Sequence, residues 1–461
     1  PVIIIYLLMI LLGWINIYAA VYNPEHHSIF DFSQRYGKQL IWIIAAIVLA
    51  FFVMIIDERF YSFFAYVLYG ITIFLLLAVL VIGKEINGAK SWIVMGGIQV
   101  QPSEFAKIGT ALALAKYMST YNFRLQNIKS YLKIALIILT PAALIALQPD
   151  MGSSIVYFVF ILVLYREGLS PVIPLIAVYL GALFIMSLVL DVFVLTLVMI
   201  AFTGLVYWIM SKKPKYVFNA AVIFGLLYAT AFFINKNLDL GYSKYILLLV
   251  CLGISVLIYL VLAFQHKIQH VILILVLMLV SIGFTYSVDY AINNVLESHQ
   301  QKRINILLGL EEDPQGAGYN VQQSKIAIGS GGFSGKGFLQ GTQTKYKFVP
   351  EQSTDFIFCT VGEEWGFLGT STVIILFIIL LVRLVILAER QKTAFNRIYG
   401  YGVVSILFFH VTINIGMTIG LFPVIGIPLP FFSYGGSSLW AFTILLFIFL
   451  RLDAERMEKM R

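Results

Sequence analysis

The sequence predicts an all-α fold, a polytopic transmembrane helix bundle. Hydrophobic residues make up 60% of the 461 residues and charged residues only 12%, about half the charged fraction of soluble domains. Apolar stretches long enough to cross about 30 Å of hydrocarbon recur along the chain. We expect about fourteen helices: a short polar one at 104–118, and apolar ones near 2–21, 39–56, 60–82, 133–147, 152–165, 171–190, 192–210, 216–234, 245–264, 271–288, 356–382, 398–421 and 437–450.

The basic residues indicate on which side of the membrane each loop lies. Lys and Arg number 31 against 23 Asp and Glu. In a membrane protein this excess is a topology signal, so no nucleic-acid partner is expected. Counting helices places most basic loops on one side, which the positive-inside rule assigns to the cytoplasm. These are Arg59, 124–133, Arg166, 212–215, Lys267, 383–397 and the tail from Arg451, whereas Arg35, Lys38 and Lys84 fall on the outer side.

The same count gathers four polar loops on the outer face: 83–103, Gln148–Asp150, 289–355 and Pro423–Ser433. The longest, 289–355, is Gly-rich, and its backbone groups would go unpaired in hydrocarbon. It is therefore predicted as a large extracytoplasmic loop. The whole chain, 1–461, is interpreted as a single membrane domain with its polar chemistry on this outer face.

Neither the cysteines nor the histidines indicate a cofactor. Cys251 and Cys359 lie inside apolar runs, where cysteine acts as a small hydrophobe. His410 has no second His, Cys or carboxylate at a ligand spacing beside it, so it is interpreted as a packed polar residue. No metal site and no other cofactor is expected.

The loop and short helix at 87–107 carry three candidate residues. Glu104 and Lys107 stand three apart on the helix and share one face, where they can neutralise each other at membrane depth. They are either functional or an ion pair that lets a polar helix insert. Trp92, in the preceding loop, is either a site residue or an aromatic of the interfacial belt.

The glycine-rich run around Lys336 does not match the pattern of a nucleotide-binding loop. The pattern GxxxxGK[ST] requires Gly at 330 and Ser or Thr at 337, whereas the chain has Ser330 and Gly337, so this interpretation fails. Lys336, with Lys302 and Arg303 upstream, can still hold a phosphate group through cationic side chains and backbone donors. An ordinary solvated loop is the alternative.

Carboxylates are densest in FVPEQSTDFIFCTVGEEWGFLG. Asp355 immediately precedes an apolar helix, so it is expected as an N-cap carboxylate. The same place, at the boundary of water and lipid, suits a general base, and the helix N-terminus is expected to lower its pKa. Glu363 and Glu364 lie farther into the helix, where an ionisable residue is functional or paired.

Several of these motifs together resemble the SEDS family of shape, elongation, division and sporulation proteins. They are QPSEFAK, QPDMGSS, DPQGAGYNVQQSKIAIGSGGFSGKGFLQGTQ, FVPEQSTDFIF, GEEWGFLG and NIGMTIGLFPVIGIPLPFFSYGGSS. The resemblance covers nearly the whole chain except about 171–288, and it is strongest to the RodA branch, the rod shape-determining proteins. Members of the family have a ten-helix bundle. Here 171–288 holds about five helices where they have one, which predicts about four extra, inserted helices.

The resemblance implies a peptidoglycan glycosyltransferase that polymerises lipid II at the outer face of the bacterial cytoplasmic membrane during cell elongation. Asp355 occupies the position of the family's catalytic aspartate. Glu104 and Lys107 match its functional Glu and Lys, and Trp92 matches its loop tryptophan. The implied partner is a class B penicillin-binding protein.

The expected mechanism follows from these assignments. Asp355 removes the proton from the acceptor hydroxyl, which attacks the donor sugar as undecaprenyl pyrophosphate leaves with inversion, giving a β-1,4 strand. Lys107, Lys302, Arg303 and Lys336 are candidates to bind the anionic groups. Two alternatives stay open: a lipid II flippase or transporter, and a non-catalytic membrane scaffold for a penicillin-binding protein.

Overall fold

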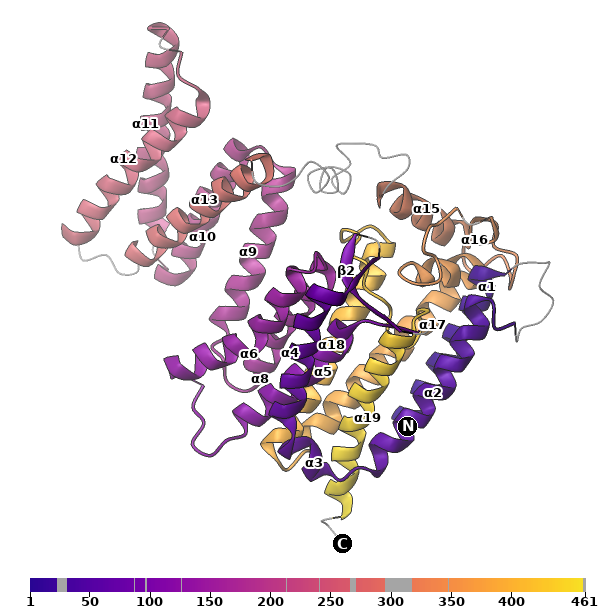
Figure 1. Ribbon diagram of the computed structural model, residues 1–461. Helices are drawn as coiled ribbons and strands as arrows, with labels where there is room; N and C mark the ends of the chain where they lie inside the picture. The colour runs from indigo at the N-terminus through magenta and orange to yellow at the C-terminus, as the bar shows by residue number, and fades with distance from the viewer. Residues whose placement is uncertain are drawn as a thin grey trace. The chain divides into compact units, whose positions relative to one another are not determined.

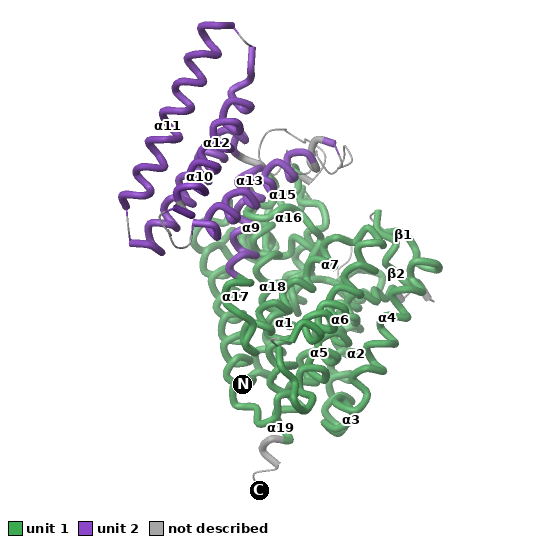
Figure 2. The backbone as a smooth tube through the Cα atoms, turned by 90° about the vertical axis from the view of Figure 1, so that its left-hand side faces the viewer, with its two compact units in different colours: residues 1–174, 312–461 green, residues 175–311 purple. Residues whose placement is uncertain are grey.

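The computed structural model describes residues 1–22, 31–86, 88–95, 98–125, 127–212, 214–239, 241–265, 271–294, 317–346 and 348–458. The chain forms two compact units, one of residues 1–174 and 312–461 and one of residues 175–311 (Figure 2). Lys302 and Arg303, two of the predicted cations, lie outside the described residues. The two units are described in turn below as unit 1 and unit 2.

Unit 1 is a helical bundle whose polar helix, α5, lies inside it. Its helices are α1 (Val2–Val21), α2 (Arg35–Ile55), α3 (Glu58–Phe63), α4 (Ala65–Ile82), α5 (Pro102–Met118), α6 (Ile128–Ala146), α7 (Met151–Ile155), η1 (Val156–Val159), α8 (Phe160–Arg166), α15 (Ala317–Ser330), α16 (Thr342–Lys345), α17 (Ile357–Glu389), α18 (Ala394–Thr418) and α19 (Gly436–Glu458). Helix α5 is buried along most of its length and contacts α4, α6, α18 and α19. Neighbouring helices rather than lipid therefore surround its polar side chains, which is where polar groups inside a membrane are tolerated.

Three predicted helices of unit 1 are interrupted. The helix expected at 60–82 is divided at Phe64 into α3 and α4. The helix expected at 152–165 consists of α7, the 3₁₀ turn η1 and α8. Helix α17 breaks at Gly366, which has φ 61° and ψ −154°. Only glycine adopts such a conformation readily. The break exposes backbone groups of α17 to the loop that precedes it in sequence.

The outer loop 83–103 contains a small antiparallel sheet that the sequence analysis did not predict. Strands β1 (Lys84–Ile86), β2 (Ala89–Met95) and β3 (Ile98–Val100) pair in the order β1-β2-β3. Lys84 pairs with Trp92 in this register. Gly88, with φ 81°, lies in the tight connection between the first two strands, where a positive φ is needed.

Unit 2 consists of apolar helices that account for the predicted run 171–288. They are α9 (Val172–Val189), α10 (Val192–Ser211), α11 (Pro214–Asn237), α12 (Lys244–Gln265) and α13 (Val271–Asn294). Helix α10 packs against α13, and α11 packs against α12. Helix α11 buries none of its described residues in the protein. An apolar helix without buried side chains is suited to a lipid environment.

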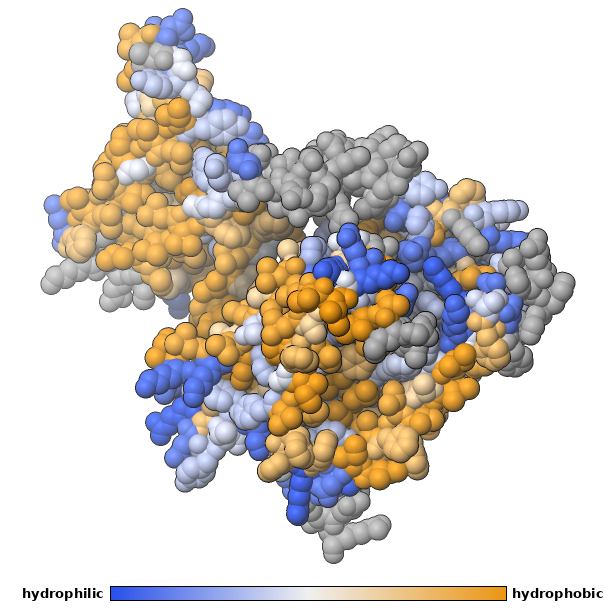
Figure 3. Space-filling view, viewed as in Figure 1, coloured by the Kyte–Doolittle hydropathy of each residue, from blue (hydrophilic) through white to orange (hydrophobic). Residues whose placement is uncertain are grey.

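The described helices confirm the predicted membrane fold. Eleven of them are long and apolar enough to cross a bilayer. Helix α5, helix α9 and the interrupted helix Met151–Arg166 correspond to the remaining predicted spans. Hydrophobic residues cover the middle of unit 1, and hydrophilic residues gather toward its ends (Figure 3). The chain is a multi-pass membrane protein, and β2, α15 and α16 lie at the end of unit 1 opposite α3 and the C-terminal end of α19 (Figure 1).

Candidate active site

Asp355 lies in a turn two residues before helix α17, and it is not the N-cap. The carbonyl oxygen of Glu351 accepts hydrogen bonds from the backbone N–H groups of Thr354 and Phe356, at 3.1 and 3.3 Å. These bonds continue the turn past Asp355, so the helix begins at Ile357 and Phe356 takes the N-cap position. The predicted N-cap role of Asp355 is therefore wrong.

The backbone around Asp355 is fixed by α18 and by the loop that follows it. Asn414 of α18 donates from Nδ2 to the carbonyl oxygens of Asp355 and Ile427, at 2.8 and 2.7 Å. Ser433 donates to the carbonyl oxygen of Thr354 at 2.6 Å. Helix α18 and the loop after it, both far from Asp355 in the sequence, thus hold the Asp355 turn in place.

The carboxylate of Asp355 is in a strongly perturbed environment. Burial, followed by the negative charges of Glu351 and Asp150, raises the pKa of Asp355 to about 7. The expected lowering by the helix N-terminus is wrong, because the side chain does not cap the helix and two other carboxylates lie nearby. The side chain keeps part of its surface accessible, and within the described part of the chain its carboxylate accepts no hydrogen bond. A carboxylate in this state can accept a proton near neutral pH.

Asp150 joins the start of α7 to the start of α5. Its carboxylate accepts hydrogen bonds from the Ser153 N–H, at 3.1 Å, and from Nε2 of Gln101, at 2.9 Å. Asp150 is the N-cap of α7. A Cβ atom at Gly152 would lie 2.1 Å from the carbonyl oxygen of Ile425, so only glycine lets this turn approach the 423–428 loop.

Arg35 is a cation of this site that sequence reasoning missed. Its Nη1 donates to Ser353 Oγ at 2.7 Å and lies 3.5 Å from the carboxylate of Glu351. The guanidinium also lies 5.8 Å from the centre of the Tyr434 ring. Arg35 was noted only as an exception to the positive-inside rule, and that departure was the signal that could have indicated it.

Glu104 and Lys107 form a buried pair that includes His410. The ammonium of Lys107 lies 2.8 Å from the Glu104 carboxylate and 3.0 Å from Nε2 of His410. Nδ1 of His410 is 3.2 Å from the carbonyl oxygen of Pro428. Because an ammonium only donates, Nε2 accepts and Nδ1 carries the proton toward Pro428. This chain of contacts connects α5 through α18 to the loop beside Asp355.

Lys336 belongs to a different cluster, centred on Glu363 of α17. The fully buried Glu363 carboxylate accepts hydrogen bonds from Nζ of Lys336 at 2.7 Å and from the backbone N–H groups of Gln343 and Thr344 at 2.8 and 2.9 Å. Glu363 therefore has the partner that its position in an apolar helix predicted. The cation expected to bind a phosphate is already paired.

The glycines beside Lys336 permit close packing of the loop on α17. The backbone N–H groups of Lys336 and Gly337 donate to the carbonyl oxygens of Glu363 and Glu364, each at 3.0 Å. A Cβ atom at Gly335 would lie 2.1 Å from the Glu364 oxygen. The run around Lys336 and Gly337 is thus packed on α17, while Gly332, Phe333 and Ser334 are exposed.

Comparison with known proteins identifies the family. A model of the FtsW, RodA and SpoVE family, described as cell cycle protein, matches residues 1–213 and 197–458. The chain belongs to this family. It is the SEDS family that the motifs indicated, and that assignment is confirmed.

Curated relatives of this SEDS protein carry an enzymatic name. The chain is 32% identical to the peptidoglycan glycosyltransferase RodA of Treponema pallidum (strain Nichols), over 97% of this chain and 95% of the relative. It is 31% identical to the peptidoglycan glycosyltransferase MrdB of Escherichia coli (strain K12), over 94% of this chain and 88% of the relative.

Solved structures confirm the fold of this SEDS protein. The crystal structure of RodA from Thermus thermophilus gives a TM-score of 0.56 at 24% identity, covering 99% of this chain and 96% of that one. A chain from a structure entitled structural coordination of polymerization and crosslinking by a peptidoglycan synthase complex gives 0.64 at 24% identity, covering 99% and 97%.

The structure brings some of the predicted site residues of the SEDS protein together and leaves others apart. Asp355 lies beside the loop that Lys107 contacts through His410. Trp92 lies in β2, which packs against α4 and α5, and no described hydrogen bond or ring contact joins it to Asp355. Among the residues that the structure describes, no group of three or more His, Cys, Asp or Glu side chains is placed to hold a metal ion.

Replacing Glu363 by glutamine is expected to loosen the loop around Lys336. The variant loses the charge that accepts four hydrogen bonds, at a cost of about 2 kcal/mol for local opening, or about thirtyfold faster exchange. Hydrogen exchange of 336–345 measures the effect. Glu351→Gln, in the following turn, is the matched control, and equal exchange in both variants would contradict this role of Glu363.

Proposed function

We propose that this chain is a peptidoglycan glycosyltransferase that polymerises lipid II into β-1,4 glycan strands at the outer face of the bacterial cytoplasmic membrane during cell elongation. The observation that carries the proposal is the Asp355 carboxylate, whose backbone is fixed by Asn414 while its pKa is raised to about 7. Family membership and the names of the curated relatives support the same activity.

In the proposed reaction Asp355 is the general base. Its carboxylate accepts the proton of the 4-hydroxyl on the acceptor's N-acetylglucosamine, and that oxygen attacks C1 of the donor's N-acetylmuramic acid. The bond from C1 to undecaprenyl pyrophosphate breaks on the opposite side, which inverts the configuration. A single displacement requires one base and no second carboxylate as nucleophile. A pKa near the working pH suits this task.

The pyrophosphate groups require positive charge near the reacting carbon. Arg35, which contacts Ser353 and Glu351, supplies positive charge at the Asp355 turn. Lys302 and Arg303 remain candidates for the same purpose. Lys107 and Lys336 are assigned instead to positioning, because each already forms an ion pair with a buried carboxylate.

A class B penicillin-binding protein is the proposed partner. Glycan strands made at the outer face must be cross-linked there, and such a protein carries the cross-linking activity implied by the family resemblance. The structural likeness to a chain of a peptidoglycan synthase complex supports this assignment.

We also propose that about four of the helices within 171–288 are an insertion relative to the ten-helix bundle of the family.

The polymerisation rate is expected to rise with pH through a midpoint near 7. Only the deprotonated form of Asp355 accepts a proton, so each pH unit below the midpoint lowers kcat/KM by about tenfold. Glu351→Gln removes a negative neighbour, so it should shift the midpoint to lower pH. Initial rates with labelled lipid II between pH 5 and 9 test this. A midpoint that is the same in both proteins would contradict the proposed electrostatics.

A further inference from the structure

Unit 1 contains a pocket that the proposed reaction does not use. It has a volume of about 400 Å³ and is lined by Tyr66, Tyr117, Leu132, Lys133, Leu136 and Ile137. These residues come from α4, α5 and α6. The volume is within the range of roughly 300–1,000 Å³ that is usual for small-molecule sites.

The pocket is apolar except at one end. Leu132 and Leu136 are exposed on one side, and buried Ile137 forms part of the wall. Tyr69 of α4 donates a hydrogen bond to the carbonyl oxygen of Ile137 at 3.1 Å, which ties α4 to α6 behind the pocket. The pocket is thus formed by side chains of three packed helices.

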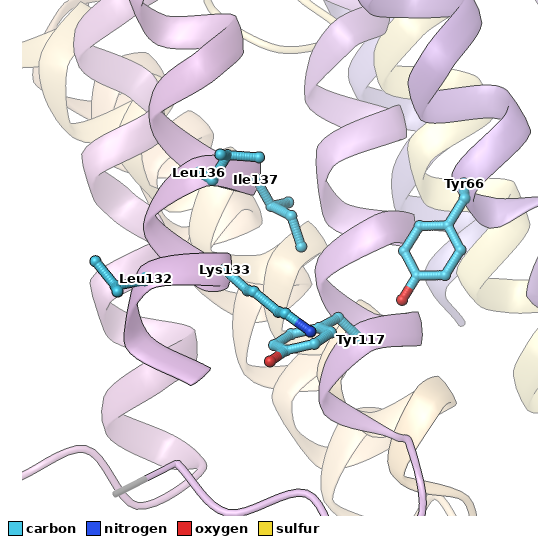
Figure 4. A pocket seen from close by; sticks show the side chains of 6 residues that line it. All are labelled: Tyr66, Tyr117, Leu132, Lys133, Leu136 and Ile137. Atoms are coloured by element: carbon cyan, nitrogen blue, oxygen red, sulfur yellow. The ribbon is translucent and has the colours of Figure 1, made fainter. Parts of the chain in front are cut away.

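The polar end of the pocket carries a cation. Lys133 extends from α6 toward Tyr117 of α5, and Tyr66 of α4 lies across the hollow (Figure 4). Nζ of Lys133 is 5.8 Å from the centre of the Tyr117 ring. Lysine side chains commonly place their methylene stems on apolar surface and their ammonium groups in the headgroup region.

The pocket lies at the opposite end of α5 from the candidate active site. Glu104 stands in the first turn of α5, whereas Tyr117 precedes its last residue, Met118. Lys133 stands near the start of α6. By the positive-inside rule this end of the bundle faces the cytoplasm.

Positive charge near the pocket is not neutralised by described acidic residues. Arg124, Lys129 and Lys133 form no ion pair with any residue in the described ranges. Asp57 and Glu58 lie near this end, on or before α3, but they do not line the pocket. An anionic ligand with an apolar body would therefore complement the site.

We propose that this pocket binds an anionic phospholipid of the cytoplasmic leaflet. One acyl chain occupies the hollow beside Leu132, Leu136 and Ile137, and the phosphate pairs with Lys133. Basic pockets between helices at the cytoplasmic side are suited to such headgroups. The proposal is independent of the glycosyltransferase function, because it rests on the other end of the bundle.

The test uses the purified full-length protein in neutral nanodiscs. Phosphatidylglycerol and phosphatidylcholine with the same photoactivatable acyl chain are compared for labelling of α4, α5 and α6. Lys133→Glu should lower labelling by phosphatidylglycerol about fivefold, the ratio expected for one lysine near an anionic headgroup. Lys129→Glu, which changes a nearby exposed lysine outside the pocket, should lower it clearly less than Lys133→Glu does.

A filled pocket and a competing anion provide two further measurements. Leu136→Trp fills the hollow and should reduce labelling by both lipids. Millimolar inorganic phosphate should not compete, because it lacks the apolar body. The proposal is overturned if wild-type protein takes up both lipids equally, if Lys129→Glu has the same effect as Lys133→Glu, or if phosphate displaces the lipid.

Discussion

Replacing Asp355 by asparagine is expected to lower the rate of lipid II polymerisation by about 10³-fold. Asparagine has nearly the same shape as aspartate but cannot accept a proton from the attacking hydroxyl. The bonds that hold this turn, from Asn414 and Ser433, use backbone oxygens at 355 and 354 and should persist. The variant should therefore be folded and inactive.

The control for Asp355→Asn is a neighbouring carboxylate of the same turn. Glu351→Gln removes a negative charge near Asp355 but leaves the proposed base in place. It should remain active at neutral pH and unfold at nearly the wild-type temperature. An active Asp355→Asn variant, or equal losses in the two variants, would contradict the assignment of Asp355.

Replacing Lys107 by methionine is expected to destabilise the protein by about 3–5 kcal/mol, because it leaves a buried carboxylate without its partner. Lys107 and Glu104 are 2% and 3% exposed, so water cannot easily replace the lost contact. His410 loses its donor as well, and with it the link from α5 to Pro428.

A double-mutant cycle separates this effect from simple loss of packing. Glu104→Gln combined with Lys107→Met removes both charges, so the double variant should be more stable than Lys107→Met alone. Thermal unfolding in detergent, at one protein concentration, measures the stability of the single and double variants. Additive losses from the two changes would show that the pair is not coupled.

The helices were predictable because membrane thickness sets the length of an apolar span. The small sheet at 84–100 was not predictable, because its strands lie among polar and glycine residues and show no continuous alternation of apolar and polar side chains. The start of α17 was placed one residue too early because the hydrogen bonds to the carbonyl oxygen of Glu351 depend on the local turn. The direction of the pKa shift of Asp355 was predicted wrongly, because its burial and the nearby charge of Asp150 depend on segments far apart in sequence.

The candidate site was predictable as single residues but not as a set of contacts. The spacing of Glu104 and Lys107 predicted their pairing, which follows from helix geometry alone. Their third partner, His410, lies 303 positions after Lys107 and appeared only as a lone histidine. Lys336 was expected to face a ligand. Glu363 was recognised as an ionisable residue in an apolar helix, but nothing in the sequence indicated that it would form an ion pair with Lys336.

The central claim is that this chain polymerises lipid II and that Asp355 performs the proton transfer. Gel separation of the products from purified protein and labelled lipid II, with and without a class B penicillin-binding protein, tests it most directly. We expect a ladder of glycan strands from the wild-type protein and none from Asp355→Asn under either condition. A wild-type protein that makes no strands with the partner present, or an Asp355→Asn variant that yields the same ladder, would contradict the claim.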